Sequence, residues 1–159
     1  MMMDEFRKHF STLDVFVNNS GITKTAPFLE TDRELFDSVF GLNLRGSFFC
    51  IQQAAKYFAE RNIRGSIVVI SSNNDRAHFA NVSVYGSVKT ALTKLAEHAA
   101  VELARYGIRV NTIAPGWTNT GEARMGRPEA TFYKIPLKRW CAPEEIGKAV
   151  LFLCSEAAA

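Results

Sequence analysis

Residues 80–111, ANVSVYGSVKTALTKLAEHAAVELARYGIRVN, contain a long helical pattern that leads directly into an apolar, β-branched run. Apolar residues recur at helical spacing through residues 83–106, and Gly107 is placed to end that helix. Residues 108–115, IRVNTIAP, predict a buried strand that a Pro-Gly pair terminates. A long helix followed by a short apolar strand is typical of α/β proteins.

The same alternation continues on both sides of this stretch. Residues 13–21, LDVFVNNSG, and residues 65–72, GSIVVISS, are short apolar runs, and each predicts a buried strand. Residues 73–82 predict the loop between the second strand and the long helix. A last helix is expected from Ala142 onward, with Pro143 near its first position and two acidic residues in its first turn.

A further helix is predicted between the first two strands, over residues 31–62. Thr31 and Glu34 match a capping box at its start, and apolar residues follow at helical spacing. Gly41 and Gly46 lie inside this pattern, so we expect a kink or a break there.

Strands that are apolar throughout and alternate with amphipathic helices predict a parallel sheet covered on both faces. We therefore expect an α/β fold in which residues 1–159 form a single domain, because no repeat or linker interrupts the pattern. Ligands of such sheets bind outside the carboxyl ends of the strands. That rule selects residues 18–21, residues 71–72 and residues 115–120 as one predicted crevice.

The composition excludes several classes of function. The chain is 47% hydrophobic and 22% charged, which is near the average for soluble globular proteins. The net charge is +3 and the basic residues are scattered, so no nucleic-acid partner is expected. The first residues, MMMDEFRKHFSTLD, lack the apolar segment of a signal peptide, and no apolar run approaches the ~20 residues of a membrane helix. We therefore expect a cytoplasmic protein that has no membrane partner.

The cysteines and histidines do not favour a metal centre. The three cysteines lie far apart and lack CxxC spacing, which predicts reduced thiols, two of them in packed helices. They are Cys50, Cys141 and Cys154. The three histidines are isolated, and no bound metal is expected. They are His9, His78 and His98.

Tyr85 and Lys89 lie one helical turn apart, on one face of the predicted helix. A free phenol has a pKa of ~10 and is a poor proton donor or acceptor at neutral pH. A nearby ammonium favours the phenolate, so Lys89 is placed to make Tyr85 a better acid or base. The alternative is that Tyr85 packs and Lys89 is solvated, and the spacing alone does not exclude it.

Two further polar residues fall near this pair in the predicted fold. Ser72 ends a buried strand, where its hydroxyl can hold a substrate oxygen beside the phenol. Asn43 lies inside a predicted helix, in GLNLRG, where asparagine competes with the helical hydrogen bonds. The alternative for Asn43 is a local hydrogen bond that shapes the kink.

Taken in order, these motifs resemble the short-chain dehydrogenase/reductase family, most closely the branch of 3-oxoacyl-carrier-protein reductases and sugar dehydrogenases. The motifs are NNSG at 18–21, a mid-helix Asn, a Ser thirteen residues before a Tyr, YGSVK at 85–89 and IRVNTIAPGWTNT at 108–120. Each motif alone is weak, but their order and spacing are specific, and the resemblance covers essentially the whole chain. It implies a partial Rossmann-like, doubly wound parallel sheet.

The resemblance implies an oxidoreductase that transfers a hydride between NAD or NADP and a secondary alcohol or ketone. Tyr85 would be the general acid/base, Lys89 would lower its pKa and bind the nicotinamide ribose, and Ser72 would orient the substrate oxygen. Asn43 would hold a water that links Lys89 to solvent. The other positions that match cofactor contacts are Asn19, Ser20, Gly21, Pro115, Gly116, Thr118 and Thr120.

Two parts of the family pattern are missing from the sequence. None of the ten glycines forms the GxxxGxG turn that normally holds the dinucleotide pyrophosphate, and the residue that separates NAD from NADP is missing with it. CSEAAA, at 154–159, ends where the family continues to a final strand. We therefore expect the C-terminal catalytic portion of a longer enzyme, which a truncated gene model, a degenerate gene or a fragment would each explain. The alternative is a catalytically silent chain that acts, if at all, by association.

Residues 117–140 correspond to the mobile substrate lid of the family, and the substrate itself is not predicted. Trp117 either lines the pocket or packs within the loop, as do Met125, Phe132, Tyr133 and Trp140. Arg124 and Arg127 either meet an anionic group or are solvated. A homo-oligomer through the two long helices is expected, although helix-on-sheet packing explains the small residues Ala91, Ala99, Ala100 and Ala104 as well.

Overall fold

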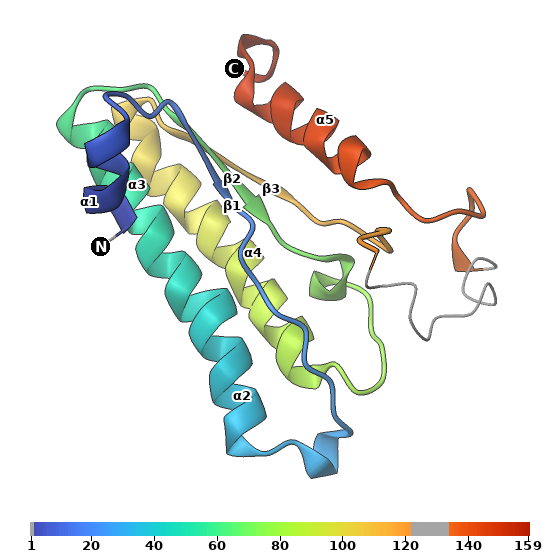
Figure 1. Ribbon diagram of the computed structural model, residues 1–159. Helices are drawn as coiled ribbons and strands as arrows, with labels where there is room; N and C mark the ends of the chain where they lie inside the picture. The colour runs from blue at the N-terminus through green and yellow to red at the C-terminus, as the bar shows by residue number, and fades with distance from the viewer. Residues whose placement is uncertain (1, 122–133) are drawn as a thin grey trace.

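The computed structural model describes residues 2–121 and 134–159. These residues form a three-stranded parallel sheet in the order β1-β2-β3, with helices on both of its faces (Figure 1). The strands are β1 (Val15–Asn18), β2 (Ser66–Ile70) and β3 (Arg109–Ile113). The α-helices are α1 (Met2–His9), α2 (Arg33–Phe40), α3 (Ser47–Glu60), α4 (Ser83–Leu103) and α5 (Pro143–Cys154). The predicted α/β alternation is confirmed, with strands shorter than the apolar runs that predicted them.

The two faces of the sheet are covered by different helices. Along β2, Ile67 and Val69 point to the side of α3 and α4, where they are fully buried in a core that includes Leu92. Val68 is also fully buried, on the opposite side, where α5 packs over β2 and β3 (Figure 1). The register pairs Val17 of β1 with Val68, yet the Val17 side of β1 is not covered, and Val17 is 39% exposed.

Helices α2 and α3 form one continuous rod with a π-helical turn at Gly41–Gly46 between them. The two glycines therefore mark an irregular turn and not a break. The predicted capping box is wrong by one residue, because Asp32 is the N-cap and its carboxylate accepts a hydrogen bond of 2.8 Å from the Leu35 N–H. Thr31 instead donates its hydroxyl to the Pro27 carbonyl at 3.1 Å.

Two glycines are required by the backbone and the packing. Gly107 has φ 70°, the left-handed conformation predicted for the residue that ends the long helix. Gly65 precedes β2, and a Cβ placed on it would lie 2.5 Å from the ring of Phe58. Glycine at this position lets α3 approach the start of the strand.

Arg109 fastens the C-terminal end of α5 to the sheet. Its guanidinium donates to the carbonyl of Leu153 at 2.7 Å, and also to those of Ser155 at 3.3 Å and Ala158 at 3.4 Å. The last carbonyls of a helix have no intrahelical partner, and a cation at that end also meets the negative pole of the helix dipole. Arg109 therefore fixes where α5 lies over β2 and β3.

The cysteine prediction is confirmed, because all three thiols are free and Cys50 and Cys154 lie in α3 and α5. Over residues 2–121 and 134–159, no helix combines the length and the apolar character needed to cross a bilayer.

Candidate active site

A cavity of about 1280 Å³ opens at the carboxyl ends of the three strands. Three of the four predicted catalytic residues line it, namely Ser72, Tyr85 and Lys89. Most predicted cofactor contacts line it as well, namely Asn19, Gly21, Pro115, Gly116, Thr118 and Thr120. The remaining two predicted residues, Ser20 and Asn43, are not among the lining residues; Ser20 is exposed and Asn43 is buried.

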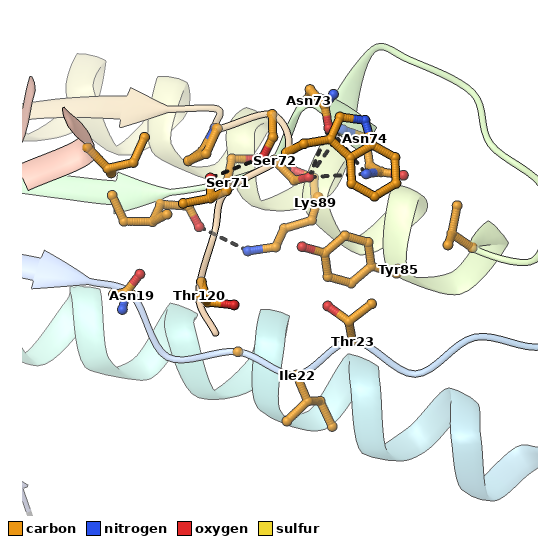
Figure 2. A pocket seen from close by; sticks show the side chains of 18 of the residues that line it. Asn19, Ile22, Thr23, Ser71, Ser72, Asn73, Asn74, Tyr85, Lys89 and Thr120 are labelled. Carbon is orange, nitrogen blue, oxygen red and sulfur yellow. Dashed lines mark hydrogen bonds between the residues drawn. The ribbon is translucent and has the colours of Figure 1, made fainter. Parts of the chain in front are cut away.

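Lys89 is buried at the centre of this group. It is 6% exposed, its Nζ donates a hydrogen bond of 2.9 Å to the Ile70 carbonyl, and that Nζ lies 5.7 Å from the centroid of the Tyr85 ring. Figure 2 shows both side chains pointing into the same space, beside Ser72. Burial lowers the pKa of the Lys89 ammonium below its usual range. The alternative in which Lys89 is simply solvated is therefore wrong.

Hydrogen bonds at the end of β2 fix the position of α4 along the sheet, and with it the positions of Tyr85 and Lys89. The Ser71 hydroxyl donates to the Lys89 carbonyl at 3.1 Å, and the Thr93 hydroxyl lies 2.8 Å from Ser71 Oγ and 2.9 Å from Asp75 Oδ2. Ser71 was selected from the sequence only as a strand end, and the positioning role of Thr93 was missed. The helical spacing of Thr93 from Lys89 is the signal that placed it on this face.

Ser72 caps the short turn that follows β2. Its Oγ accepts hydrogen bonds from the backbone N–H and from the side-chain Nδ2 of Asn74, each at 3.2 Å (Figure 2). The Ser72 hydroxyl also lies 3.5 Å from Asn73 Oδ1. The hydroxyl proton of Ser72 therefore has only this one long contact to an acceptor among the described residues. Because Ser72 lines the cavity, that proton is available to a ligand there.

Asn43 holds the loop that follows β1. Its Oδ1 accepts from the Ile22 N–H and its Nδ2 donates to the Ile22 carbonyl, both at 2.8 Å. The alternative of a local hydrogen bond at the kink is wrong, because the partner lies 21 residues away. Gly21 leaves room for this contact, since a Cβ there would lie 3.3 Å from Asn43 Oδ1. The asparagine therefore places the backbone that borders the cavity.

Trp117 lines the cavity and also packs, so its two predicted roles are both realised. Its ring meets that of Phe79 edge-to-face, with centroids 6.1 Å apart, and both residues border the cavity. Trp140 does not line it. The other predicted lid residues, Arg124, Met125, Arg127, Phe132 and Tyr133, lie outside the described residues.

The segment around Cys141 pairs with the backbone of residues 117–119, beside the cavity. Cys141 N–H donates to the Trp117 carbonyl at 2.8 Å, and Asn119 N–H donates to the Cys141 carbonyl at 2.9 Å. Arg139 then grips Glu145 with two hydrogen bonds of 2.6 and 2.7 Å, and Glu145 accepts a third, of 2.8 Å, from the backbone of Ala142. The Arg139 guanidinium, followed by the Ala142 N–H, lowers the pKa of Glu145 to about 2. This pair fixes the start of α5, whose Ile146 borders the cavity.

The described residues contain no group of three or more His, Cys, Asp or Glu side chains that could hold a metal ion. The lining of this cavity supplies the ammonium groups of Lys24 and Lys89, the phenol of Tyr85, several hydroxyls and side-chain amides, and backbone groups. Such groups can hold ribose or substrate hydroxyls and move a proton.

Comparison with known proteins identifies the class. A family model described as enoyl-(acyl carrier protein) reductase matches residues 1–159. Human L-xylulose reductase is 36% identical over 91% of this chain, and carbonyl reductase [NADPH] 2 of Sus scrofa is 34% identical over 92%. An uncharacterized oxidoreductase of Escherichia coli, YohF, is 33% identical over 99% of this chain. The chain belongs to the short-chain dehydrogenase/reductase family.

Solved structures agree with this assignment. A short chain dehydrogenase from Bacillus anthracis has a TM-score of 0.90 at 30% identity, and acetoin dehydrogenase from Enterobacter cloacae has 0.89 at 33%. Each comparison covers 99% of this chain, but only 63% and 62% of those chains. The curated relatives named above are likewise matched over 61–64% of their length. One similar structure, ElxO, contains bound NADP, at 29% identity and a TM-score of 0.87.

Proposed function

We propose that this chain carries the catalytic part of an oxidoreductase that interconverts a secondary alcohol and a ketone with NAD or NADP. The observation that carries the proposal is the burial of Lys89 beside Tyr85, in a cavity that Ser72 also lines. Burying a lysine ammonium costs free energy unless hydrogen bonds or an opposite charge compensate it, so a buried lysine in a cavity indicates a binding or catalytic role. The names of two relatives, a carbonyl reductase and an L-xylulose reductase, support a small carbonyl or sugar substrate.

The nicotinamide half of the cofactor fits this cavity. Lys89 has three N–H donors, and only the one to Ile70 is used within the described residues, so the others can hold ribose hydroxyls. Asn19 and Gly21 would border the same ribose, while Gly116, Thr118 and Thr120 would line the nicotinamide side. When bound, the cofactor supplies or accepts the hydride. The sequence contains no GxxxGxG turn for the pyrophosphate, so the fit is to this half alone.

The residues of the chain would move the proton and orient the reacting oxygen. Ser72 would donate a hydrogen bond to that oxygen, and Tyr85 would give it a proton in reduction and remove one in oxidation. The positive charge of Lys89, whose Nζ lies 5.7 Å from the centroid of the Tyr85 ring, would favour the phenolate that forms when Tyr85 gives up its proton. Asn43 would act by holding the Ile22 backbone, and a water between Asn43 and Lys89 would complete the proton path.

Tyr85→Phe tests the proposal, in a protein that carries these residues together with a glycine-rich phosphate-binding unit. Loss of the phenol hydroxyl should reduce kcat by about 10²–10⁴-fold, the usual worth of general acid–base catalysis, and leave folding nearly unchanged. The matched control is Tyr106→Phe, because Tyr106 is exposed and lies outside the cavity. Retention of most activity by Tyr85→Phe would contradict the assignment.

A second candidate function is association without turnover. It is supported by half-exposed aromatic residues on α3, where Phe48 is 41% and Phe49 is 54% exposed. A homo-oligomer through α3 and α4 is the corresponding proposal. An in-frame glycine-rich βαβ unit in the DNA upstream of Met1 would favour the enzyme instead.

A further inference from the structure

Asn74 is the one residue that bonds Ser72 with both its backbone and its side chain among the described residues. It lies in the turn after β2 and borders the cavity. Nothing in the sequence pattern singled it out. Its effect on Ser72 can be derived from the number of hydrogen bonds that a hydroxyl can make.

A serine hydroxyl has two acceptor sites and one proton. Both acceptor sites of Ser72 Oγ are filled by Asn74, one by its N–H and one by its Nδ2, each at 3.2 Å. The only acceptor near the Ser72 proton in the described residues is Asn73 Oδ1, at 3.5 Å, which is long for a hydroxyl donor. The hydroxyl can therefore make a further strong hydrogen bond only by donating.

The orientation of the Asn74 amide follows from its neighbours. Its Nδ2 lies 3.3 Å from Asn73 Oδ1 as well as 3.2 Å from Ser72 Oγ, so an oxygen at that position would face the Asn73 oxygen. Its Oδ1 is buried and has no hydrogen-bond partner within residues 2–121 and 134–159. A buried unpaired acceptor is unfavourable, and this amide keeps its nitrogen toward Ser72 in spite of it.

We propose that Asn74 is a positioning residue that makes Ser72 an obligate hydrogen-bond donor to the reacting oxygen. This inference rests on the proposed function. A hydroxyl that accepts two N–H bonds is polarised and becomes a stronger donor. Ser72 then favours the species with the most electron-rich oxygen, which is the alkoxide-like oxygen that develops during reduction of a ketone. Asn74 thus acts on turnover more than on substrate binding.

The test is a double-mutant cycle in a protein that carries these residues together with a glycine-rich phosphate-binding unit, loaded with NADPH or NADH, with cyclohexanone as the ketone. Asn74→Ala should lower kcat by about 10-fold, the worth of one hydrogen bond, with little change in KM. Ser72→Ala should lower kcat further, and the double variant should equal Ser72→Ala, because Asn74 acts only through Ser72. His78→Ala is the control, since His78 lies in the same loop but does not line the cavity.

Asn74→Asp separates positioning from packing. The carboxylate has the same shape but accepts the Ser72 proton, so kcat should fall by about 100-fold at neutral pH. That loss should diminish as the pH is lowered, because a protonated carboxyl regains a donor. Additive effects in the cycle, or wild-type kcat in Asn74→Asp, would overturn the inference while leaving the proposed function intact. Wild-type kcat in Ser72→Ala would overturn the proposed function, and the inference with it.

A second readout needs no turnover. In ¹⁵N-labelled chain, Ser72→Ala should shift the side-chain amide resonances of Asn74 and speed their exchange with water. The side-chain amide of Asn111, which lies outside the cavity, should not respond. Unchanged Asn74 resonances would show that the Ser72–Asn74 contact does not exist in solution, and the inference would be wrong.

Discussion

The two faces of the sheet differ in how completely they are covered. On one face α3 and α4 pack against all three strands: Ile67 and Val69 of β2 are 0% exposed, and Phe16 of β1 and Val110 of β3 are partly buried against the same core. On the other face α5 covers β2 and β3 but not β1, where Val15 is 37% and Val17 is 39% exposed. The catalytic candidates lie on the first, closed side of the strand ends, because α4 supplies Tyr85 and Lys89.

This difference separates two requirements of the proposed reaction. Proton transfer depends on a rigid, desolvated group, and the α4 side provides one. Pyrophosphate binding depends on a glycine-rich turn and a helix N-terminus, and the sequence has no GxxxGxG turn. The motifs present in these 159 residues therefore match the proton-transfer requirement and not the pyrophosphate requirement.

The largest expected effect concerns the 159-residue chain taken alone. Since β1 pairs only with β2 among the described residues and leaves Val15 and Val17 exposed, we expect concentration-dependent self-association by light scattering. We also expect no saturable binding of NAD(H) or NADP(H) below millimolar by calorimetry. A monodisperse monomer with micromolar affinity would show that the covered face alone suffices for cofactor binding.

The next effect is that of Lys89→Met, in a protein that also carries a phosphate-binding unit. It should reduce kcat by about 10²-fold or more and also weaken cofactor binding, because the same ammonium acts on both. Lys89→Arg should not restore full activity, since a planar guanidinium does not replace a compact ammonium. Lys94→Met, at an exposed position of the same helix, is the control. Unchanged cofactor affinity in Lys89→Met would remove the ribose role and leave the electrostatic one.

A pair of glycine substitutions compares the packing of the two faces directly. Gly65→Ala should destabilise the fold by about 1–3 kcal/mol, because its Cβ would lie 2.5 Å from the buried ring of Phe58. Gly147→Ala, in α5, meets nothing within 4 Å and should stabilise by about 0.5–1 kcal/mol, the difference between the two residues in a helix. Urea unfolding of both variants measures the difference, and equal stabilities would contradict the contrast between the faces.

The smallest effect is expected at the start of α5. The pKa of Glu145 is about 2, below the ordinary ~4.3, so its pair with Arg139 stabilises the folded state fully above about pH 4.3. That contribution is lost as the pH falls through about 2, and it is small because the pair is exposed. Thermal melts should show a slightly lower Tm for Glu145→Gln at pH 6, and no difference near pH 2. A constant difference across that range would show that the charge of Glu145 is not involved.

Much of the fold followed from the sequence because local signals agreed with one another. Apolar β-branched runs predicted all three strands, and Gly107 and Pro143 marked the helix ends where they are observed. The cap at Asp32 was misplaced by one residue because Thr31, Asp32 and Glu34 offer competing capping patterns. The π-helical turn could be predicted only as an irregularity at Gly41 and Gly46. The hydrogen bonds of Asn43, which lies in that turn, could not be predicted because they are made to Ile22, 21 residues away.

The candidate site was predictable where its residues follow strand ends or share a helix face. Ser72 follows a strand end, Tyr85 and Lys89 share a helix face, and all three line the cavity. Helical spacing from Lys89 places Thr93 on the correct face of α4 but does not reveal its contact with Ser71. The contact of Asn74 with Ser72 depends on the turn after β2, and no sequence spacing specifies it. Phe79 lies in a loop that was predicted without internal detail, so its contact with Trp117 could not be foreseen.

Arg109 is connected to the cavity through α5, although it does not line the cavity itself. It anchors the C-terminal end of α5, while Ile146, Gly147 and Val150 of the same helix contribute to the cavity wall. A hydrogen-bonded helix is stiff, so a substitution of Arg109 that moves the C-terminal end of α5 would also shift the residues of α5 that line the cavity. Under the proposed function, we therefore expect substitutions at Arg109, which does not line the cavity, to change substrate preference.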